Sequence, residues 1–354
     1  MRILHTYCLN YNLGDYALGI GVKNLLRQHL DVDLIGETNL QGTLFNSYYI
    51  EEVVNKRYDL LVIGGGGVIH GAHWPNGWFW LIKEENIRKI KIPFIVYGVG
   101  YNYFKDEGGI PEIGRSHLKE TIKRAAYFSL RNDGSVDRFK EQMGIEVPEV
   151  PDPGFHMNLN KTYSCPEKAS YVIVQLANDK PAHRFGSDEN KARFIADMRA
   201  VVSRIAKDHK VIFAPHVLDD VSLSQEIAGG IENAFVWDFS KYAFDNVAES
   251  IAYYQDAHYV LAMRGHGQIL PMAFNVPVIS IENHPKHSGL MRRLGLENYN
   301  VSLREDGFRD KLTETIRHLE TNKDSYVKKL LSKNAEMLKD SQDAFEVIRT
   351  RILS

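Results

Sequence analysis

The chain has 354 residues, of which 44% are hydrophobic and 25% charged, so it is long enough for two folded domains of ordinary globular composition. Its 43 basic residues nearly balance its 45 acidic ones, and the net charge of -2 argues against a general attraction to nucleic acid or anionic lipid. An anionic ligand would have to be bound by a local cluster of cations.

The cysteine content and the amino-terminal residues indicate a compartment. Cys8 and Cys165 are far apart in sequence, which argues against a disulfide framework and fits reducing conditions. The first fifteen residues lack the apolar core of a signal peptide, and no apolar run approaches the roughly 20 residues of a membrane helix. We therefore expect a cytoplasmic protein, at most docked peripherally on the inner face of the membrane.

The first half of the chain alternates short apolar runs with amphipathic segments. The runs expected to form strands are 2–8, 32–36, 59–65, 93–100 and 126–131. Apolar residues recur at helical spacing near 16–30, 79–91, 115–125 and 135–143. This alternation predicts parallel βαβ units.

The same alternation restarts after the proline-rich segment 147–155, which we interpret as the domain boundary. Strands are expected at 171–176, 210–215, 234–238, 258–263 and 276–281, and helices at 188–208, 221–229, 245–256, 268–274 and 306–320. From about residue 323 onward, the spacing of apolar residues predicts one or two long helices.

The sequence therefore predicts an α/β protein with two Rossmann-like, doubly wound domains that face each other across a cleft. The domains are 1–155 and 156–322, followed by a helical segment 323–354, which together describe a GT-B-like architecture. In such sheets, ligands bind beyond the carboxyl ends of the strands, so we look for function in the loops that follow strands.

The loop after the first strand reads NYNLGDYALG (10–19). Gly14 permits a tight turn, and Asp15 is suited to cap a helix that begins at Tyr16. Alternatively, Asn12 and Asp15 line the cleft and form hydrogen bonds with a sugar or phosphate. Both interpretations stay open.

The loop after the third strand, GGGGVIHG (64–71), is rich in glycine and is followed by an aromatic segment. Gly65 and Gly66 would let backbone N–H groups point at an anion, with His70 and Trp74 lining the cleft. The loop matches neither a P-loop nor a dinucleotide fingerprint. The aromatic residues either stack on a sugar ring or form a hydrophobic cap.

Arg131 ends the fifth predicted strand, beside Asn132 and Asp133. One interpretation pairs Arg131 with a nearby carboxylate while Asp133 caps the next helix. The other uses the guanidinium fork to bind a carboxylate or phosphate of a ligand. The position in the predicted cleft favours the second.

The most informative segment is 260–290, where a buried strand delivers Arg264 and His266 two residues apart, flanked by glycines. A helix expected to start near Gln268 would add backbone N–H groups, beginning beside Gly267. The next strand-end loop supplies Lys286 together with His284 and His287. These residues predict an anion site, and the alternative is a set of internal salt bridges and caps.

A metal site is the other interpretation of the histidines in this half of the chain. Imidazole groups suit Zn²⁺, but His216, His266, His284 and His287 meet no recognised ligand spacing. We therefore expect no metal.

Six short motifs occur in a characteristic order: NLGD, IGGGG, YGVG, SLRND, DPGF and RGHG. In this order and spacing, which spans nearly the whole chain, the sequence resembles the polysaccharide pyruvyl transferase family. The resemblance implies a GT-B-like fold and phosphoenolpyruvate as donor, with no further cofactor. It also implies transfer of pyruvate as a ketal to a sugar hydroxyl pair, on a lipid-linked or nucleotide-linked saccharide of a capsule or exopolysaccharide.

The resemblance also implies roles for single residues. Arg131, Arg264 and His266 match the residues that hold or activate the donor, and Gly267 and Lys286 would add contacts to it. A group that titrates near neutral pH suits protonation of the donor's methylene carbon, which makes His266 the expected acid. The 1–155 domain would then bind the acceptor.

The sequence departs from the family pattern at two positions. Tyr16 stands where an acidic residue is common, and Gly265 stands where leucine is usual. The first departure concerns the acceptor side more than the donor side.

Two other functions compete with this prediction. A GT-B glycosyltransferase with a nucleotide-sugar donor would share the fold and the basic site, and Glu282 would then contact the donor's ribose or sugar. A non-catalytic sugar- or phosphate-binding relative would share the fold too. The retained cluster of Arg131, Arg264, His266 and Lys286 argues against the non-catalytic alternative.

Overall fold

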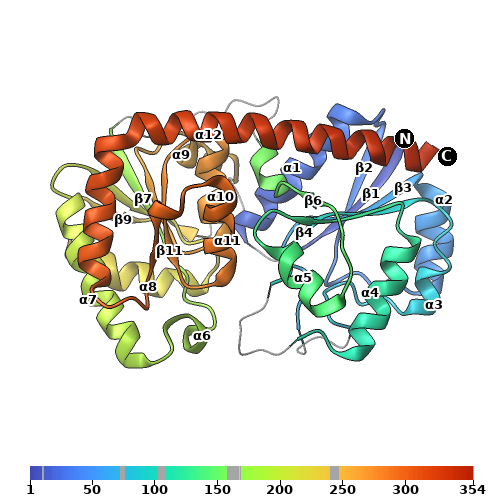
Figure 1. Ribbon diagram of the computed structural model, residues 1–354, viewed down its shortest axis with the longest axis horizontal. Helices are drawn as coiled ribbons and strands as arrows, with labels where there is room; N and C mark the ends of the chain where they lie inside the picture. Colours follow the sequence, from blue (N-terminus) through green and yellow to red (C-terminus); the bar gives the residue numbers. More distant parts are fainter. Residues whose placement is uncertain are drawn as a thin grey trace. The chain divides into compact units, whose positions relative to one another are not determined.

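The computed structural model describes residues 1–9, 12–71, 76–102, 109–157, 167, 169–239 and 247–353. Its contacts divide the chain into two units (Figure 1). The N-terminal unit comprises Met1–Asn10, Leu18–Leu159 and Glu336–Ser354, and the C-terminal unit comprises Tyr11–Ala17 and Asn160–Ala335. Each unit holds one six-stranded sheet in which every described strand pair is parallel, so the predicted pair of Rossmann-like α/β folds is confirmed.

The sheet of the N-terminal unit has the order β2-β1-β3-β4-β5-β6. Its strands are β1 (Arg2–Tyr7), β2 (Leu34–Asn39), β3 (Leu60–Gly64), β4 (Phe94–Val99), β5 (Tyr127–Arg131) and β6 (Glu149–Val150). Because β2 lies on one side of β1 and β3 on the other, the strand order reverses between β1 and β3. The glycine-rich loop 64–71 follows β3, one of the two strands at this reversal.

Helices cover both faces of this sheet, which is why β3 and β4 are apolar along their whole length and fully buried. One core contains Trp78, Trp80 and Leu118, and the other contains Leu18 and Phe345. The helices are α1 (Leu13–His29), α2 (Asn55–Arg57), α3 (Glu84–Ile87), α4 (Glu112–Arg124) and α5 (Ser135–Met143), with a π-helical turn at Tyr49–Val54 and a 3₁₀ turn at Pro153–His156.

The helix expected at 79–91 is reduced to α3. Residues before it are extended: Ile69 forms a β-bridge with Trp78, and Phe79 donates its N–H to the carbonyl of Val68. Because Trp78 and Trp80 are fully buried, they serve as core residues, as the hydrophobic-cap interpretation expects.

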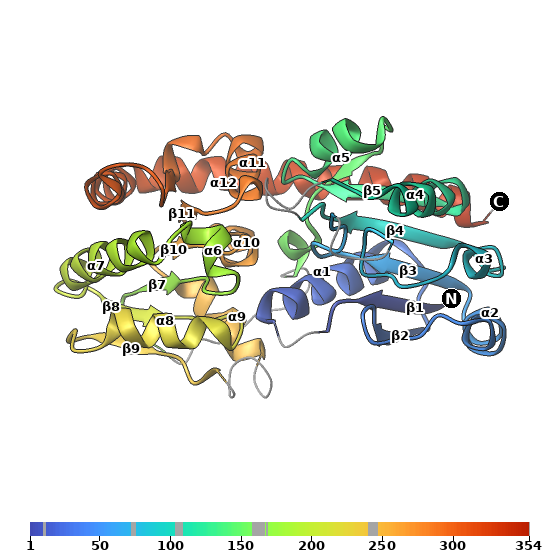
Figure 2. The same cartoon turned by 90° about the horizontal axis from the view of Figure 1, so that it is seen from below.

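The sheet of the C-terminal unit has the order β12-β11-β10-β7-β8-β9, which can be followed in Figure 2 from β11 to β9. Its strands are β7 (Tyr171–Gln175), β8 (Lys210–Phe213), β9 (Ala234–Val236), β10 (Val260–Ala262), β11 (Val278–Glu282) and β12 (Asn300–Ser302). This is the strand order of the dinucleotide-binding Rossmann fold, with its switch point between β7 and β10.

Among the described residues, six α-helices connect these strands, and two of them were not predicted. They are α6 (Pro181–Phe185), α7 (Asp188–Ile205), α8 (Asp219–Ala228), α9 (Val247–Asp256), α10 (Gly265–Ala273) and α11 (Pro285–Leu294). The unpredicted α6 and α11 both begin with proline, a residue suited to the first helical position. As a consequence, Lys286 and His287 lie in the first turn of a helix and not in a loop.

The last element, α12 (Phe308–Leu353), joins the helix expected at 306–320 to the expected trailing helices, with a kink at Asn322. Its residues up to Ala335 belong to the C-terminal unit, and Glu336–Ser354 belong to the N-terminal unit, where Phe345 is buried in the core. Residues of the helical segment expected at 323–354 thus belong to both units. No helix among the described residues, α12 included, is long and apolar enough to cross a membrane.

Candidate functional site

The C-terminal unit concentrates its polar side chains at the switch point of its sheet, where β7 and β10 end side by side. The Gln175 side-chain oxygen, at the end of β7, accepts a hydrogen bond of 2.8 Å from the backbone N–H of Arg264. A Cβ on Gly267 would lie only 2.5 Å from that oxygen, so the close approach requires glycine. These contacts fix the start of α10 against the neighbouring strand.

The Arg264 guanidinium lies between two aspartates. Its Nε and Nη2 donate to both carboxylate oxygens of Asp220, at 2.8 and 2.6 Å, and Nη2 also contacts Asp179. Burial alone would lower the pKa of Arg264, but these carboxylates outweigh that effect and raise the pKa above its ordinary value. The side chain therefore makes the internal salt bridges that one interpretation of the sequence expected.

Asp220, at the start of α8, joins three strand-end loops. Besides Arg264, its buried carboxylate accepts backbone N–H groups of Asn178 at 3.0 Å, His216 at 3.2 Å and Val217 at 3.3 Å. The loops after β7, β8 and β10 thus meet at one side chain. Nothing in the local sequence pattern singled this residue out.

A second arginine completes the network. Arg184, in the unpredicted helix α6, donates from Nη2 to both oxygens of Asp179 at 2.9 Å, and its Nη1 contacts the side-chain oxygen of Asn283. Burial alone would raise the pKa of Asp179, but Arg264 and Arg184 hold it below its ordinary value. Two arginines balance two aspartates, so the network has no net charge.

Further cationic and backbone groups lie beside this network. The first backbone hydrogen bond of α10 runs from the Gln268 N–H to the Arg264 carbonyl. The N–H groups of residues 265–267 therefore lie at the amino end of the helix, before its hydrogen-bonded turns. Lys286, in the first turn of α11, lies beside Gly265 at the start of α10. A Cβ added to Gly265 would be 3.6 Å from the Lys286 Cε. His284 caps α11 by accepting the Lys286 N–H at 3.2 Å.

His266 lies in the first turn of α10, partly exposed, against the first turn of α1. A Cβ on Gly14 would overlap the His266 ring. The neighbouring Leu13 N–H donates to the carbonyl of His216 at 3.3 Å. The loop after β1 therefore contacts the site in the C-terminal unit, a juxtaposition that the sequence did not predict.

The capping of α1 differs from the expectation. The helix starts at Leu13 and not at Tyr16, and the Asn12 side chain accepts the Gly14 N–H at 2.9 Å. Asn12 is therefore the cap, and Asp15 stands in the first turn, where an acidic side chain is favourable. The expectation that Asp15 caps the helix is wrong because the helix begins three residues earlier.

His216 is a further histidine of this cluster. Its ring is fully buried, and its Nε2 lies 2.8 Å from the Tyr254 hydroxyl. Burial, followed by the nearby Arg264 and His266, lowers the pKa of His216 well below its ordinary value, so the ring is neutral. Among the described residues, no group of three or more His, Cys, Asp and Glu side chains is placed to hold a metal ion.

Arg131 has a different environment in the N-terminal unit. It is 5% exposed, and it donates to Asp133 at 2.8 Å and to Asp152 at 3.0 Å. Asp133 also accepts the Ser135 N–H at 3.0 Å at the start of α5. The β5–β6 pairing brings Asp152 to Arg131, and the internal pairing with carboxylates that the first interpretation expected is present, while contact of Arg131 with the donor stays a prediction.

The glycine-rich loop also differs from the prediction. Gly65 and Gly66 have φ values of +75° and +85°, but the Gly65 N–H donates to the Tyr97 carbonyl at 2.9 Å and is not turned toward a ligand. His70 is buried, with its Nε2 2.9 Å from the Gly67 carbonyl and its ring stacked on another aromatic side chain. Both glycines and His70 thus shape a turn, and Trp74 lies outside the described residues.

Several solved structures share the fold. The UDP-GlcNAc 2-epimerase of Neisseria meningitidis bound to UDP-GlcNAc has a TM-score of 0.58 at 11% identity, with full coverage of both chains. A UDP co-structure of MnaA from S. aureus has a TM-score of 0.57 at 11% identity, covering 93% of this chain and 91% of that one. The spinosyn rhamnosyltransferase SpnG has a TM-score of 0.56 at 8% identity, again with full coverage.

Sequence comparison identifies the family. No curated protein matches the chain. The family model for polysaccharide pyruvyl transferase, however, matches residues 12–285, which include the loop after β1, the β5 end and the Arg264–Gly267 motif. The chain therefore belongs to the polysaccharide pyruvyl transferase family.

Proposed function

We propose that the protein transfers the pyruvyl group of phosphoenolpyruvate to a pair of sugar hydroxyls as a ketal during synthesis of a surface polysaccharide. Family membership supports a polysaccharide pyruvyl transferase. The observation that carries the donor assignment is the group formed by Arg264, His266, the α10 N-terminus and Lys286 at the switch point. A lipid-linked or nucleotide-linked saccharide would be the acceptor.

Donor binding needs partners for a carboxylate and a phosphate. Asp220 and Asp179 already accept hydrogen bonds from Nε and Nη2 of Arg264. Arg264 would therefore bind the donor through Nη1 and not through two nitrogens of its guanidinium group. The N–H groups of residues 265–267 and the Lys286 ammonium supply further donors. The aspartates hold Arg264 in place before the donor arrives.

The chemistry assigns His266 the role of acid. A proton from His266 adds to the methylene carbon, using the π electrons of the enol double bond, and the central carbon becomes oxocarbenium-like. One sugar hydroxyl then attacks this carbon and gives up its proton, which replaces the proton taken from His266, and phosphate leaves with the electrons of its C–O bond. The second hydroxyl adds and loses its proton, which completes the ketal and balances the reaction as phosphoenolpyruvate plus diol giving ketal plus phosphate.

The direct test is mass spectrometry of candidate saccharides after incubation with the full chain and phosphoenolpyruvate. We expect a mass increase equal to pyruvate minus one water, accompanied by release of one phosphate. Phosphate release that does not depend on the saccharide, or the absence of the mass increase across acceptors that carry suitable hydroxyl pairs, would count against the proposal.

The competing function is glycosyl transfer from a nucleotide sugar, since the solved structures with this fold include UDP complexes. The carboxylate suggested for that role is occupied: Glu282 accepts hydrogen bonds from Ser288 at 2.8 Å and Asn300 at 2.6 Å. Thermal shift with phosphoenolpyruvate against UDP-sugars separates the two functions, because the true donor stabilises the folded chain.

A further inference from the structure

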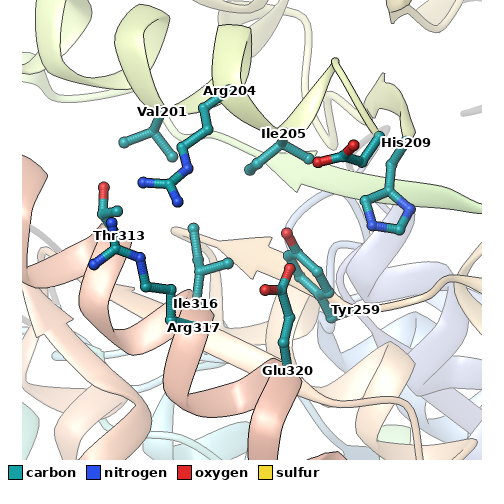
Figure 3. A pocket seen from close by; sticks show the side chains of 10 residues that line it. Val201, Arg204, Ile205, His209, Tyr259, Thr313, Ile316, Arg317 and Glu320 are labelled. Atoms are coloured by element: carbon teal, nitrogen blue, oxygen red, sulfur yellow. The ribbon is translucent and has the colours of Figure 1, made fainter.

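A cavity of about 90 Å³ opens in the C-terminal unit between α7 and α12, at the amino ends of β8 and β10 (Figure 3). Its apolar wall is formed by Val201 and Ile205 of α7 and Ile316 of α12. The proposed donor site lies at the carboxyl ends of the same strands, so this cavity is a separate feature. By comparison with the space one water needs, it holds roughly six to nine non-hydrogen atoms.

The cavity contains a buried hydroxyl without a hydrogen-bond partner. Tyr259, the residue before β10, is 1% exposed, and its hydroxyl has no partner among the described residues. Burial, with a smaller effect of Glu320, raises the pKa of this phenol, so it stays protonated and is a donor. Leaving a buried donor unpaired is costly, and a bound acceptor would remove the cost.

Exposed charged side chains of both signs line the cavity. Figure 3 shows the guanidinium groups of Arg204 and Arg317 near Thr313, and Glu320 beside Tyr259. Asp208 also lines the cavity. Within the described part of the chain, none of these four charged side chains forms an ion pair, although Arg317 and Glu320 lie three residues apart on α12 and Asp208, in the turn after α7, follows Arg204 by four residues.

We infer that this cavity binds a small dipolar ligand, with a carboxylate or phosphate at the Arg204 and Arg317 end and an ammonium group at the Glu320 end. The Tyr259 hydroxyl donates to an oxygen of the ligand. A simple anion fits less well because two carboxylates face it, and a simple cation meets two arginines. Amino acids and aminoalkyl phosphates share this chemistry, and the proposal does not depend on the reaction assigned above.

The experiment is a thermal-shift and calorimetric titration of the full chain with dipolar probes of increasing charge separation. Glycine, β-alanine and γ-aminobutyrate carry the carboxylate, and aminoethyl phosphate carries the phosphate. At least one probe should raise Tm by about 2–4 °C at ten times its Kd. Acetate, inorganic phosphate and ethylamine, which carry a charge of one sign, should each raise it by less than half as much.

Three variants locate the binding. Arg317→Ala should weaken the best probe at least tenfold. Tyr259→Phe should weaken it about threefold to tenfold while the chain still folds, because its hydroxyl makes no hydrogen bond within the described residues. Arg193→Ala changes an exposed arginine of the same helix α7 outside the cavity and should leave Kd unchanged.

Three results would overturn the inference. The first is that no dipolar probe shifts Tm. The second is that probes with a single charge shift it as much as the dipolar ones. The third is that Arg317→Ala and Tyr259→Phe leave Kd as it is in Arg193→Ala. A stronger response to carboxylate or to phosphate probes identifies the class of ligand.

Discussion

The ends of β5 and β10 each place one arginine between two aspartates, yet they differ in what surrounds the charges. Arg131 and its partners Asp133 and Asp152 have side chains that are 6%, 6% and 1% exposed. At the β10 end, the side chains of Arg264 and Asp179 are 13% and 31% exposed, and a helix N-terminus with His266 follows. An arginine at a strand end is therefore not a binding site by itself; partial exposure and adjacent backbone donors distinguish the second arrangement from the first.

The largest expected effect concerns the group that only the β10 end possesses. His266→Ala should lower the rate of acceptor-dependent phosphate release from phosphoenolpyruvate by about 10²–10⁴-fold, because it removes the proposed proton donor. Steady-state kinetics with purified protein measure the rate, and the exposed residue His318, changed to Ala, is the control. Retention of most of the activity in His266→Ala would remove the acid role.

Matched lysine substitutions test the comparison directly. Arg264→Lys should raise the KM for phosphoenolpyruvate about tenfold or more, because lysine cannot keep the two-pronged contact with Asp220 that positions the cation. Arg131→Lys should leave that KM within about twofold, yet lower the free energy of unfolding by about 1–3 kcal/mol, since a buried network loses hydrogen bonds. Steady-state kinetics and urea denaturation of both variants measure these effects. An equal rise in the KM for phosphoenolpyruvate in Arg264→Lys and Arg131→Lys would mean that the two arginines do not differ in donor binding.

A pH titration of stability tests His156, the buried histidine that follows β6 in the N-terminal unit. Burial lowers the pKa of His156 to about 4, with its Nε2 2.8 Å from the Ser341 hydroxyl. Between pH 6.5 and 4 the unfolded chain therefore binds a proton that the folded chain does not, so stability falls as the pH falls through this window. By pH 5 the loss from this one group is about 2 kcal/mol.

Urea unfolding between pH 7 and pH 5 measures that slope, and His156→Gln supplies the reference. The variant starts from lower stability, but its free energy of unfolding should change less with pH than that of the parent chain. Identical slopes for the two proteins would show that His156 does not remain neutral in the folded state.

The smallest effect tests the contact between the loop after β1 and the β10 end. In Gly14→Ala the added methyl would overlap the His266 ring and displace it, so kcat should fall about tenfold. Gly42→Ala, whose added carbon meets neighbours at ordinary contact distances of 3.4 Å or more, is the matched control and should be neutral. An unchanged kcat in Gly14→Ala would mean that the position of His266 does not depend on this contact.

Local patterns were sufficient for the regular elements of the fold. The spacing of apolar residues predicted α5 at Ser135–Met143 to the residue and most of the central strands to within two or three residues. The edge strands β6 and β12 have two and three residues, too few to show a pattern. The helix α11 was missed although Pro285 follows a capping residue, a start signal that the sequence does contain.

The sequence by itself determined the two Rossmann-like folds, the family and the Arg264–Gly267 motif, because apolar periodicity and the order of short motifs are properties of neighbouring residues. Only the tertiary structure decided that Arg131 is neutralised by Asp152, that Asp220 holds Arg264, and that Gly14 lies against His266. Each of those contacts joins residues from different strand-end loops. For the first two contacts, which loops meet depends on strand order and register within one sheet, and these are set by packing of the whole sheet rather than by any local pattern.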